Sequence, residues 1–139
     1  MSSIYLASPY HRRGELKCYA WELEYQGHTV TSRWLGGSHD SLVDGIDDVA
    51  TRGGWAAEDI ENIRAADTLL VFPLPASEGG MVTGGVHVEM GIALALGKRI
   101  IAVGGRPNVF YCLPQVEVCD DFGGALAALA TPQAGGEGQ

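Results

Sequence analysis

The sequence predicts a single-domain α/β fold with a doubly wound parallel sheet of five strands. Short β-prone runs alternate with helical stretches along the chain, which is the order typical of parallel sheets. The run Thr68–Phe72 is apolar on both faces, as expected of a strand inside such a sheet. A chain of 139 residues, 46% hydrophobic and 19% charged, suits one core.

The first elements follow from local signals. Ile4–Ala7 predicts strand one, which ends at Ser8-Pro9 because proline cannot donate a hydrogen bond to a neighbouring strand. Arg13–Gln26 has apolar residues at helical spacing and is followed by Gly27, so it predicts a helix and its end. The β-branched run Thr29–Trp34 predicts strand two.

The remaining elements alternate in the same way. Leu35–Gly54 is rich in glycine and aspartate, and we expect a loop, or a loop with a short helix, near a functional edge. The later expected elements are a helix at Ala56–Ala66, the strand Thr68–Phe72, a helix at Val86–Leu96, strands at Arg99–Val103 and Gln115–Cys119, and a helix at Gly124–Ala130.

This series predicts a flavodoxin- or Rossmann-like sheet with right-handed crossovers. With strand order 2-1-3-4-5, the loops Ser8–Arg13 and Pro73–Gly85 flank the point where the order reverses, and ligands of such sheets bind there. We expect one domain over residues 1–130 and a frayed, disordered tail over 131–139, which is rich in Gly, Gln and Ala.

Charge and cysteine content narrow the function classes. Seventeen acidic against nine basic residues give a formal charge of −8, which argues against a polymeric nucleic-acid partner. The three cysteines are odd in number and lack metal-ligand spacing, which suggests a reducing cytoplasm and no metal site. The chain has no P-loop, no spaced dinucleotide fingerprint and no apolar run of membrane-spanning length, so we expect no cofactor and no membrane partner.

Glu89 is the most informative position. It lies one turn into a helix that is otherwise apolar on every side, where burial opposes ionisation and the helix N-terminus favours it. A poorly hydrated carboxylate of this kind suits a glycosidase nucleophile, although Glu89 would equally serve to satisfy backbone donors of the first turn. Because the same helix has apolar faces beyond the one that meets the sheet, we expect a homodimer.

Other residues carry weaker signals. Thr83 and the glycines that follow it, including Gly85, offer a hydroxyl and backbone N–H groups at a helix N-terminus, which suits an anion or a plain turn. Arg12, like its neighbour Arg13, would neutralise a phosphate or simply be solvated.

Asp59 borders the apolar stripe of its helix, so it either pairs with a buried donor or binds ligand. Trp34, at the end of predicted strand two, would stack on a base or pack as a core or rim aromatic. His87 is assigned no role, because a lone histidine is more often structural than catalytic.

Three segments together resemble the nucleoside 2-deoxyribosyltransferase-like family, which includes the deoxynucleoside 5′-monophosphate N-hydrolases. These are IYLASPY at the start, EDIENIRAADTLLVF in the middle, and TGGVHVEMGIALALGKRIIAVG with RPNVF after it. The similarity runs from Ile4 to about Phe122. Its most specific part is the Gly-x-x-x-Glu-x-Gly pattern at Gly85, Glu89 and Gly91.

The resemblance implies roles for individual residues. It implies that Glu89 attacks the anomeric carbon to form a glycosyl-enzyme intermediate, and that Tyr5 positions that carboxylate by a hydrogen bond. Asp59 matches a helix carboxylate suited to bind sugar or base and to assist the leaving group. Asn108 resembles an asparagine that a neighbouring subunit contributes to the sugar's 5′ end, which again implies a homodimer.

One departure bears on the substrate. The transferases carry an aspartate six residues before the nucleophile, where this chain has Thr83, so a repulsion against phosphate is removed. The monophosphate hydrolases are more similar at this point, and Ser8, Arg12 and Thr83 would form the phosphate site. We therefore expect a nucleoside 5′-monophosphate as substrate. A base-exchanging transferase and a non-catalytic nucleotide-binding module stay open as alternatives.

Overall fold

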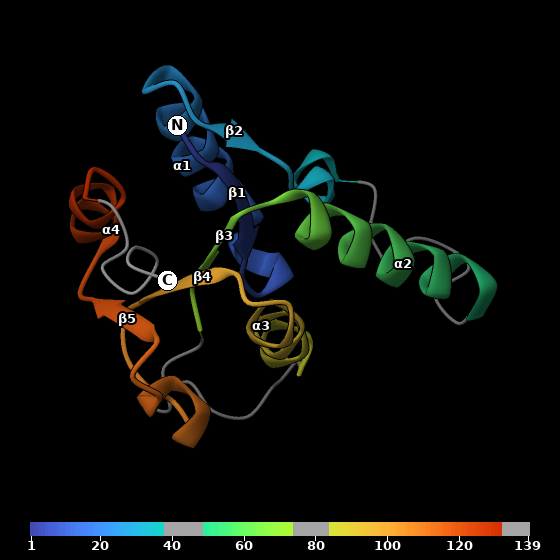
Figure 1. Cartoon of the computed structure of the whole chain (residues 1–139). Coiled ribbons are helices and arrows are strands. Elements are labelled where there is room, and N and C mark those ends of the chain that lie inside the picture. The colour runs from blue at the N-terminus through green and yellow to red at the C-terminus, as the bar shows by residue number, and fades with distance from the viewer. Residues whose placement is uncertain (38–48, 74–83, 132–139) are drawn as a thin grey trace.

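A computed structural model describes residues 1–37, 49–73 and 84–131 of the chain, and it has the α/β architecture that the sequence predicts. Figure 1 shows the elements in space. The strands are β1 (Ser3–Ala7), β2 (Thr29–Val30), β3 (Thr68–Val71), β4 (Arg99–Val103) and β5 (Val116–Cys119). The α-helices are α1 (Arg13–Tyr25), α2 (Val49–Ala65), α3 (Gly85–Ala95) and α4 (Phe122–Leu129).

The strands form one parallel sheet in the order β2-β1-β3-β4-β5, which confirms the predicted order. Helices cover both faces: α2 and α3 lie on one, and α1 and α4 lie on the other (Figure 1). Tyr19 of α1 stacks on Phe122 of α4 with ring centroids 4.1 Å apart, which joins the two helices of the second face. The fold is therefore doubly wound.

The central strands are buried because helices cover them on both sides. All four residues of β3 are buried, as the continuous apolar run Thr68–Phe72 predicts. Tyr5 lies in β1 opposite Leu69 of β3, in the middle of the sheet, and its side chain is 0% exposed. A polar hydroxyl is thereby brought into the core, where it needs a partner.

Strand two is shorter than expected, which corrects the prediction for Thr29–Trp34. After Val30 the chain leaves the sheet and forms the short 3-10 helix η2 (Arg33–Gly36). Side chains take over the hydrogen bonds that a longer strand would have made: Ser32 Oγ accepts from the Leu6 N–H at 2.8 Å, and Trp34 Nε1 donates to the Leu6 carbonyl at 2.9 Å. Because both backbone groups of Leu6 have hydrogen-bond partners, β2 can end at Val30.

Two helix boundaries also differ from expectation. α2 begins at Val49, inside the stretch expected to be a loop, and continues through Gly53 and Gly54 although each glycine costs about 1 kcal/mol in a helix. α4 begins at Phe122, because Asp121 caps it by accepting from the Gly124 N–H at 2.9 Å. Residues 38–48 and 132–139, and with them most of the predicted loop and tail, lie outside the described residues.

Candidate functional site

Tyr5 and Glu89 meet in the layer between β1 and α3. The Tyr5 hydroxyl donates to Glu89 Oε2 at 2.5 Å, although the two residues are 84 positions apart in the sequence. Tyr5 points out of the central strand β1 towards the helix that follows β3, so the contact sits where the strand order reverses. The structure thus brings together the two residues that the resemblance implies as a catalytic pair.

The environment of Glu89 changes its acidity. Burial raises the pKa of its carboxyl group from 4.5 to about 7; the Tyr5 hydrogen bond acts against that rise, and repulsion from Asp59 adds to it. Burial dominates because the charged form loses its hydration in the protein interior. A carboxyl group with a pKa near 7 is ionised in part of the molecules at neutral pH and is poorly hydrated when ionised, which suits a nucleophile.

Asp59 stands near the Tyr5–Glu89 pair. It lies half-buried on α2, which packs against both α3 and β1, and its charge acts on both members of the pair. The pKa of Tyr5 is well above its ordinary value, first because of burial and then because of the charges of Glu89 and Asp59. Tyr5 therefore keeps its proton and remains the hydrogen-bond donor.

Two candidate residues for a phosphate site follow β1. Ser8 is 8% exposed, and its hydroxyl donates to the Pro9 carbonyl at 2.9 Å. Arg12 makes a bidentate pair with Glu15 at 2.9 and 2.8 Å, and its guanidinium lies 5.5 Å from the centre of the Phe72 ring. The charge of Arg12 is therefore largely balanced by Glu15, so a phosphate would have to compete with that carboxylate.

Trp34 is packed in the core and does not line an open surface. Its side chain lies on η2, is 4% exposed, and has its ring 5.9 Å from that of Tyr10. The bond from its Nε1 to the Leu6 carbonyl fixes it there. Of the two interpretations of Trp34 from sequence, this position fits the core aromatic better than a platform for stacking a base.

Glycines form the start of α3. Gly85 is the first residue of the helix, and among the residues that the structure describes, a methyl group added at Gly84 or Gly85 would meet no heavy atom within 4 Å. Neither glycine carries a side chain that would stand beside the first N–H groups of α3, and such groups at a helix N-terminus suit an anion. Thr83, the residue expected to help bind a phosphate, lies outside the described residues.

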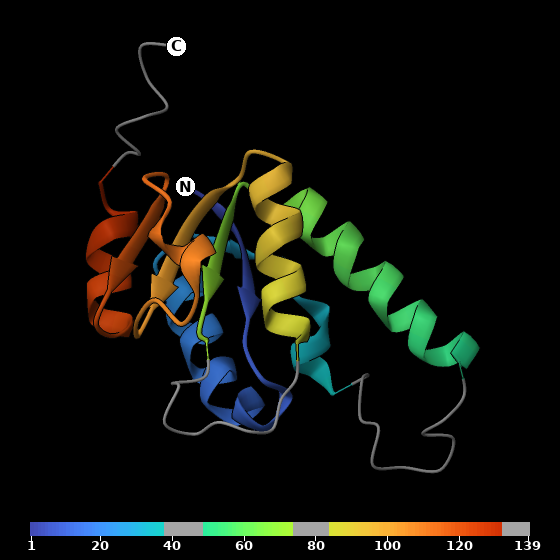
Figure 2. The ribbon, with the colours of Figure 1, turned by 90° about the horizontal axis from the view of Figure 1, so that it is seen from below.

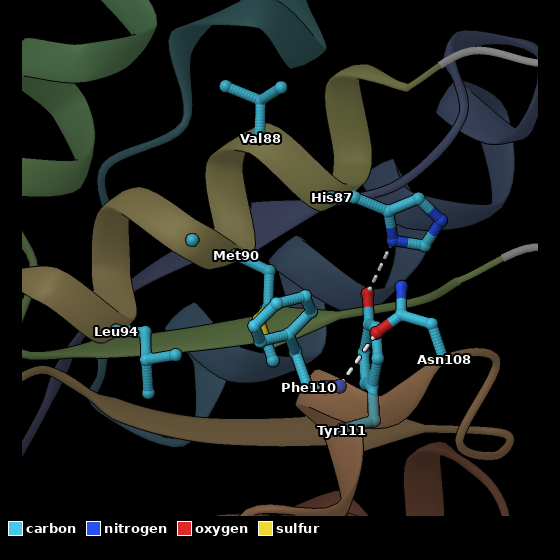
Figure 3. A pocket seen from close by; sticks show the side chains of 8 residues that line it. His87, Val88, Met90, Leu94, Asn108, Phe110 and Tyr111 are labelled. Carbon is cyan, nitrogen blue, oxygen red and sulfur yellow. Dashed lines mark hydrogen bonds between the residues drawn. The ribbon is translucent and has the colours of Figure 1, made fainter.

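A separate pocket of about 460 Å³ lies between α3 and the 3-10 helix η4 (Val109–Cys112). Figure 3 shows His87 and Tyr111 at one end of it, joined by a hydrogen bond of 3.0 Å between His87 Nδ1 and the tyrosine hydroxyl. Asn108 lines this pocket, and its side chain caps η4 by accepting from the Phe110 N–H at 2.9 Å. The pocket residues are His87, Val88, Met90, Gly91, Leu94, Asn108, Phe110 and Tyr111.

This pocket does not include Tyr5, Asp59 or Glu89. Glu89 faces β1, where its partner Tyr5 lies, whereas the pocket lies along the side of α3 that carries His87, Gly91 and Leu94. In one chain, Asn108 is thus not brought to the Tyr5–Glu89 pair.

Sequence reasoning missed several residues around the site. Tyr111 is fully buried, and its hydroxyl contacts His87. Burial raises the pKa of Tyr111 to about 12. Ser32 and Asn62 are two of the buried polar residues in the described part of the chain. Asn62 could have been noticed from sequence, because it follows Asp59 by three positions and therefore lies one helical turn away on the same side of α2.

Within the described ranges, no group of three or more His, Cys, Asp or Glu side chains is arranged to hold a metal ion. No helix in those ranges is both long enough and apolar enough to cross a bilayer.

Comparison with solved structures supports the fold. The chain is similar to the CMP N-glycosidase BcmB of Clostridium botulinum, with 20% identity, a TM-score of 0.55, and coverage of 92% of this chain and 98% of that one. It is also similar to a 2-deoxyribosyltransferase of the psychrotolerant bacterium Bacillus psychrosaccharolyticus, with 23% identity, a TM-score of 0.61, and coverage of 88% and 89%. No family model and no curated protein sequence matches the chain. At these identities the shared property is the fold, over nearly the whole length of each chain.

Proposed function

We propose that this chain belongs to the nucleoside 2-deoxyribosyltransferase-like family and cleaves the N-glycosidic bond of a nucleoside 5′-monophosphate, releasing the free base. The observation that carries the proposal is the partly buried Tyr5–Glu89 hydrogen bond at the sheet's reversal point. An N-glycosidase and a deoxyribosyltransferase share this fold, which supports the same class of chemistry.

The first step is attack on the sugar. Tyr5 donates to Glu89 Oε2, so Oε1 is the oxygen that attacks the anomeric carbon. As the new C–O bond forms, the bond from that carbon to the base nitrogen breaks, and the base leaves with the electron pair. Asp59, close to the pair, hydrogen-bonds the sugar or the base and assists the departure of the base, which takes up a proton from solvent.

Water completes the reaction. A water molecule attacks the anomeric carbon of the glycosyl ester, the bond to Glu89 Oε1 breaks, and the carboxylate is regenerated while the water proton passes to solvent. Tyr5 stabilises the carboxylate again as it is released, because a hydrogen bond to a charged oxygen is stronger than one to an ester. The products are the free base and the sugar 5-phosphate.

The 5′-phosphate is bound, in this proposal, by Ser8, Arg12 and Thr83 together with the N-terminus of α3 at Gly85. That N-terminus supplies N–H groups and a favourable dipole, and Thr83 brings no negative charge. Arg12 would exchange its Glu15 partner for the phosphate, a change that the exposed position of Glu15 permits.

A second candidate function is base exchange, favoured by the similarity to a 2-deoxyribosyltransferase. It shares the glycosyl-enzyme step and differs in the acceptor, because a second base takes the place of water. A non-catalytic nucleotide-binding module on the same fold would use the same anion site without forming a covalent bond.

We also propose that the chain acts as a homodimer. Two exposed apolar side chains line the α3–η4 pocket, Val88 at 61% exposed and Phe110 at 59%, and Val109, the neighbour of Phe110 in η4, is 75% exposed. A second copy docked on this face would cover them and would bring its own Asn108 to the neighbouring site, as the resemblance implies. Light scattering should give a dimer mass for the native protein and a monomer mass for Phe110→Asp.

The proposal assigns the activity to a single domain of residues 1–130 and to the cytoplasm. The cysteines Cys18, Cys112 and Cys119 are all free thiols, which supports a reducing compartment. Small-molecule nucleotides, and no polymeric nucleic acid or membrane, are the proposed partners.

The test is a panel of ribo- and deoxyribonucleoside 5′-monophosphates, run beside free nucleosides mixed with a second base and followed by chromatography. Release of base from a monophosphate, abolished in Glu89→Ala, is the expected result. Exchange of bases without net release would show that the protein is a transferase. Binding of a monophosphate with no base release over hours would leave only the binding module.

A further inference from the structure

Asn62 is a buried polar residue on α2. Of the residues of α2, Asn62 and Ile63 are the buried ones, and Asn62 is 7% exposed. The N-terminal part of the helix extends away from the sheet (Figure 2), and its side chains are mostly exposed. The C-terminal half of α2, which contains Asn62, therefore anchors the helix to the body of the protein.

The anchor is a set of hydrogen bonds to the segment that follows β2, beside an ion pair between Arg33 and Glu58 with N and O 3.4 Å apart. Thr31 Oγ1 donates to the Asn62 carbonyl at 2.8 Å, and the Arg33 N–H donates to Asn62 Oδ1 at 3.0 Å. Between them, Ser32 Oγ accepts from the Leu6 N–H at 2.8 Å. Three consecutive residues thus connect α2 to the position in β1 that directly follows Tyr5.

Asp59 lies three residues before Asn62, one turn along the same helix. Because a helical turn is stiff, the position that the anchor gives to Asn62 also sets how far Asp59 stands from β1 and α3. The groups that act on the Glu89 carboxyl are Tyr5, from β1, and Asp59, from α2. The anchor therefore controls one of these two influences.

We propose that Asn62 is a positioning residue: its amide and carbonyl, held by Thr31 and Arg33, keep Asp59 beside the Tyr5–Glu89 pair. The effect of Asn62 on catalysis rests on the proposed function, whereas its effect on the position of Asp59 does not. The arrangement of the charges can be measured without any substrate.

The test is a titration of the Glu89 carboxyl by carbon-13 NMR in Asn62→Leu, which keeps the size of the side chain and removes the acceptor for the Arg33 N–H. We expect the midpoint to fall by on the order of half a pH unit, because Asp59 withdraws and its repulsion weakens. Thr31→Val removes the 2.8 Å bond to the Asn62 carbonyl together with a longer bond of 3.4 Å to the Ile4 carbonyl, and it should shift the midpoint in the same direction if Asn62→Leu fails to fold. Glu61→Gln, on the exposed side of α2, is the matched control and should leave the midpoint in place.

A double-mutant cycle separates positioning from general loosening of the fold. In the Asp59→Asn background, Asn62→Leu should cause no further shift, because the group that it positions has lost its charge. An unchanged midpoint in both Asn62→Leu and Thr31→Val, or an equal shift with and without the Asp59 charge, would overturn the proposal. If the native protein releases base, Asn62→Leu should also lower kcat about tenfold with little change in KM, since misplacement of a group acting in the reaction affects kcat first. Absence of turnover in the native protein would count against the proposed function and would leave the titration result standing.

Discussion

Replacing Tyr5 with phenylalanine should raise the pKa of the Glu89 carboxyl group. The hydroxyl donates to Glu89 Oε2 at 2.5 Å and is the influence that lowers a pKa which burial has raised to about 7. A hydrogen bond to a charged group contributes about 1.5–3 kcal/mol. At about 1.36 kcal/mol per pKa unit, its loss should move the pKa to about 8–9.

The kinetic consequence follows from the fraction of Glu89 that is ionised. In the native protein about half of the carboxyl groups are ionised at pH 7, because the pKa is about 7. In Tyr5→Phe that fraction falls to roughly a tenth or a hundredth, so base release at pH 7 should fall about 5- to 50-fold. Much of the loss should be recovered at pH 9, because the nucleophile is then ionised again.

The assay is the pH dependence of kcat/KM, which reports the free enzyme, combined with an NMR titration of the Glu89 carboxyl. Tyr19→Phe is the matched control, because it removes a hydroxyl that donates to another glutamate, Glu15, at 2.6 Å. Its profile should keep the native midpoint. A Tyr5→Phe midpoint that stays at about 7 would refute the reasoning, because the hydrogen bond would then not stabilise the charged form.

Three other predictions concern stability and charge. Glu89→Gln should be more stable than the native protein above pH 7. The pKa of Glu89 is about 7 in the folded protein and 4.5 ordinarily, so the free energy of unfolding of the native protein falls as the pH rises from 4.5 to 7. At about 1.36 kcal/mol per pKa unit, the fall is about 3 kcal/mol. Thermal melts at pH 5 and pH 8 check this, and a variant with the same pH dependence as the native protein would contradict it. Asp59→Asn should lower the Glu89 pKa below about 7, because a repulsive charge is lost, and an NMR midpoint at or above the native value would argue against that contact. Trp34→Phe should lower the free energy of unfolding by about 1–3 kcal/mol, because the buried Leu6 carbonyl loses its donor; urea denaturation measures it, and a loss below 0.5 kcal/mol would show that water replaces the indole.

The strand order and the central elements could be predicted from sequence because local and long-range signals agree. Thr68–Val71 is apolar on both faces and lies in the middle of the sheet, as such a pattern requires. Glu89 could be singled out for a similar reason, since a carboxylate inside an apolar helix is unusual wherever that helix packs. Its partner Tyr5 came only from the resemblance, because nothing local marks a tyrosine in a buried strand.

The parts that could not be predicted depend on contacts between distant residues. Thr29–Trp34 has the composition of a strand, yet Ser32 and Trp34 satisfy Leu6 through their side chains and release the backbone from the sheet. The pairing of Arg12 with Glu15, one turn later in the chain, was not predicted from sequence, and the role of Arg12 towards a phosphate stays a prediction. The role of Asn62 becomes visible only when the segment after β2 is placed against α2.

The central claim is that Glu89 forms a covalent bond to the sugar, and intact-protein mass spectrometry tests it most directly. The protein would be mixed with the monophosphate that releases base, quenched in acid within milliseconds to seconds, and digested to locate any added mass. We predict a sugar-phosphate adduct on the peptide that carries Glu89, absent from Glu89→Gln. Base release at the native rate by Glu89→Gln, with no adduct on the native protein during turnover, would contradict the account.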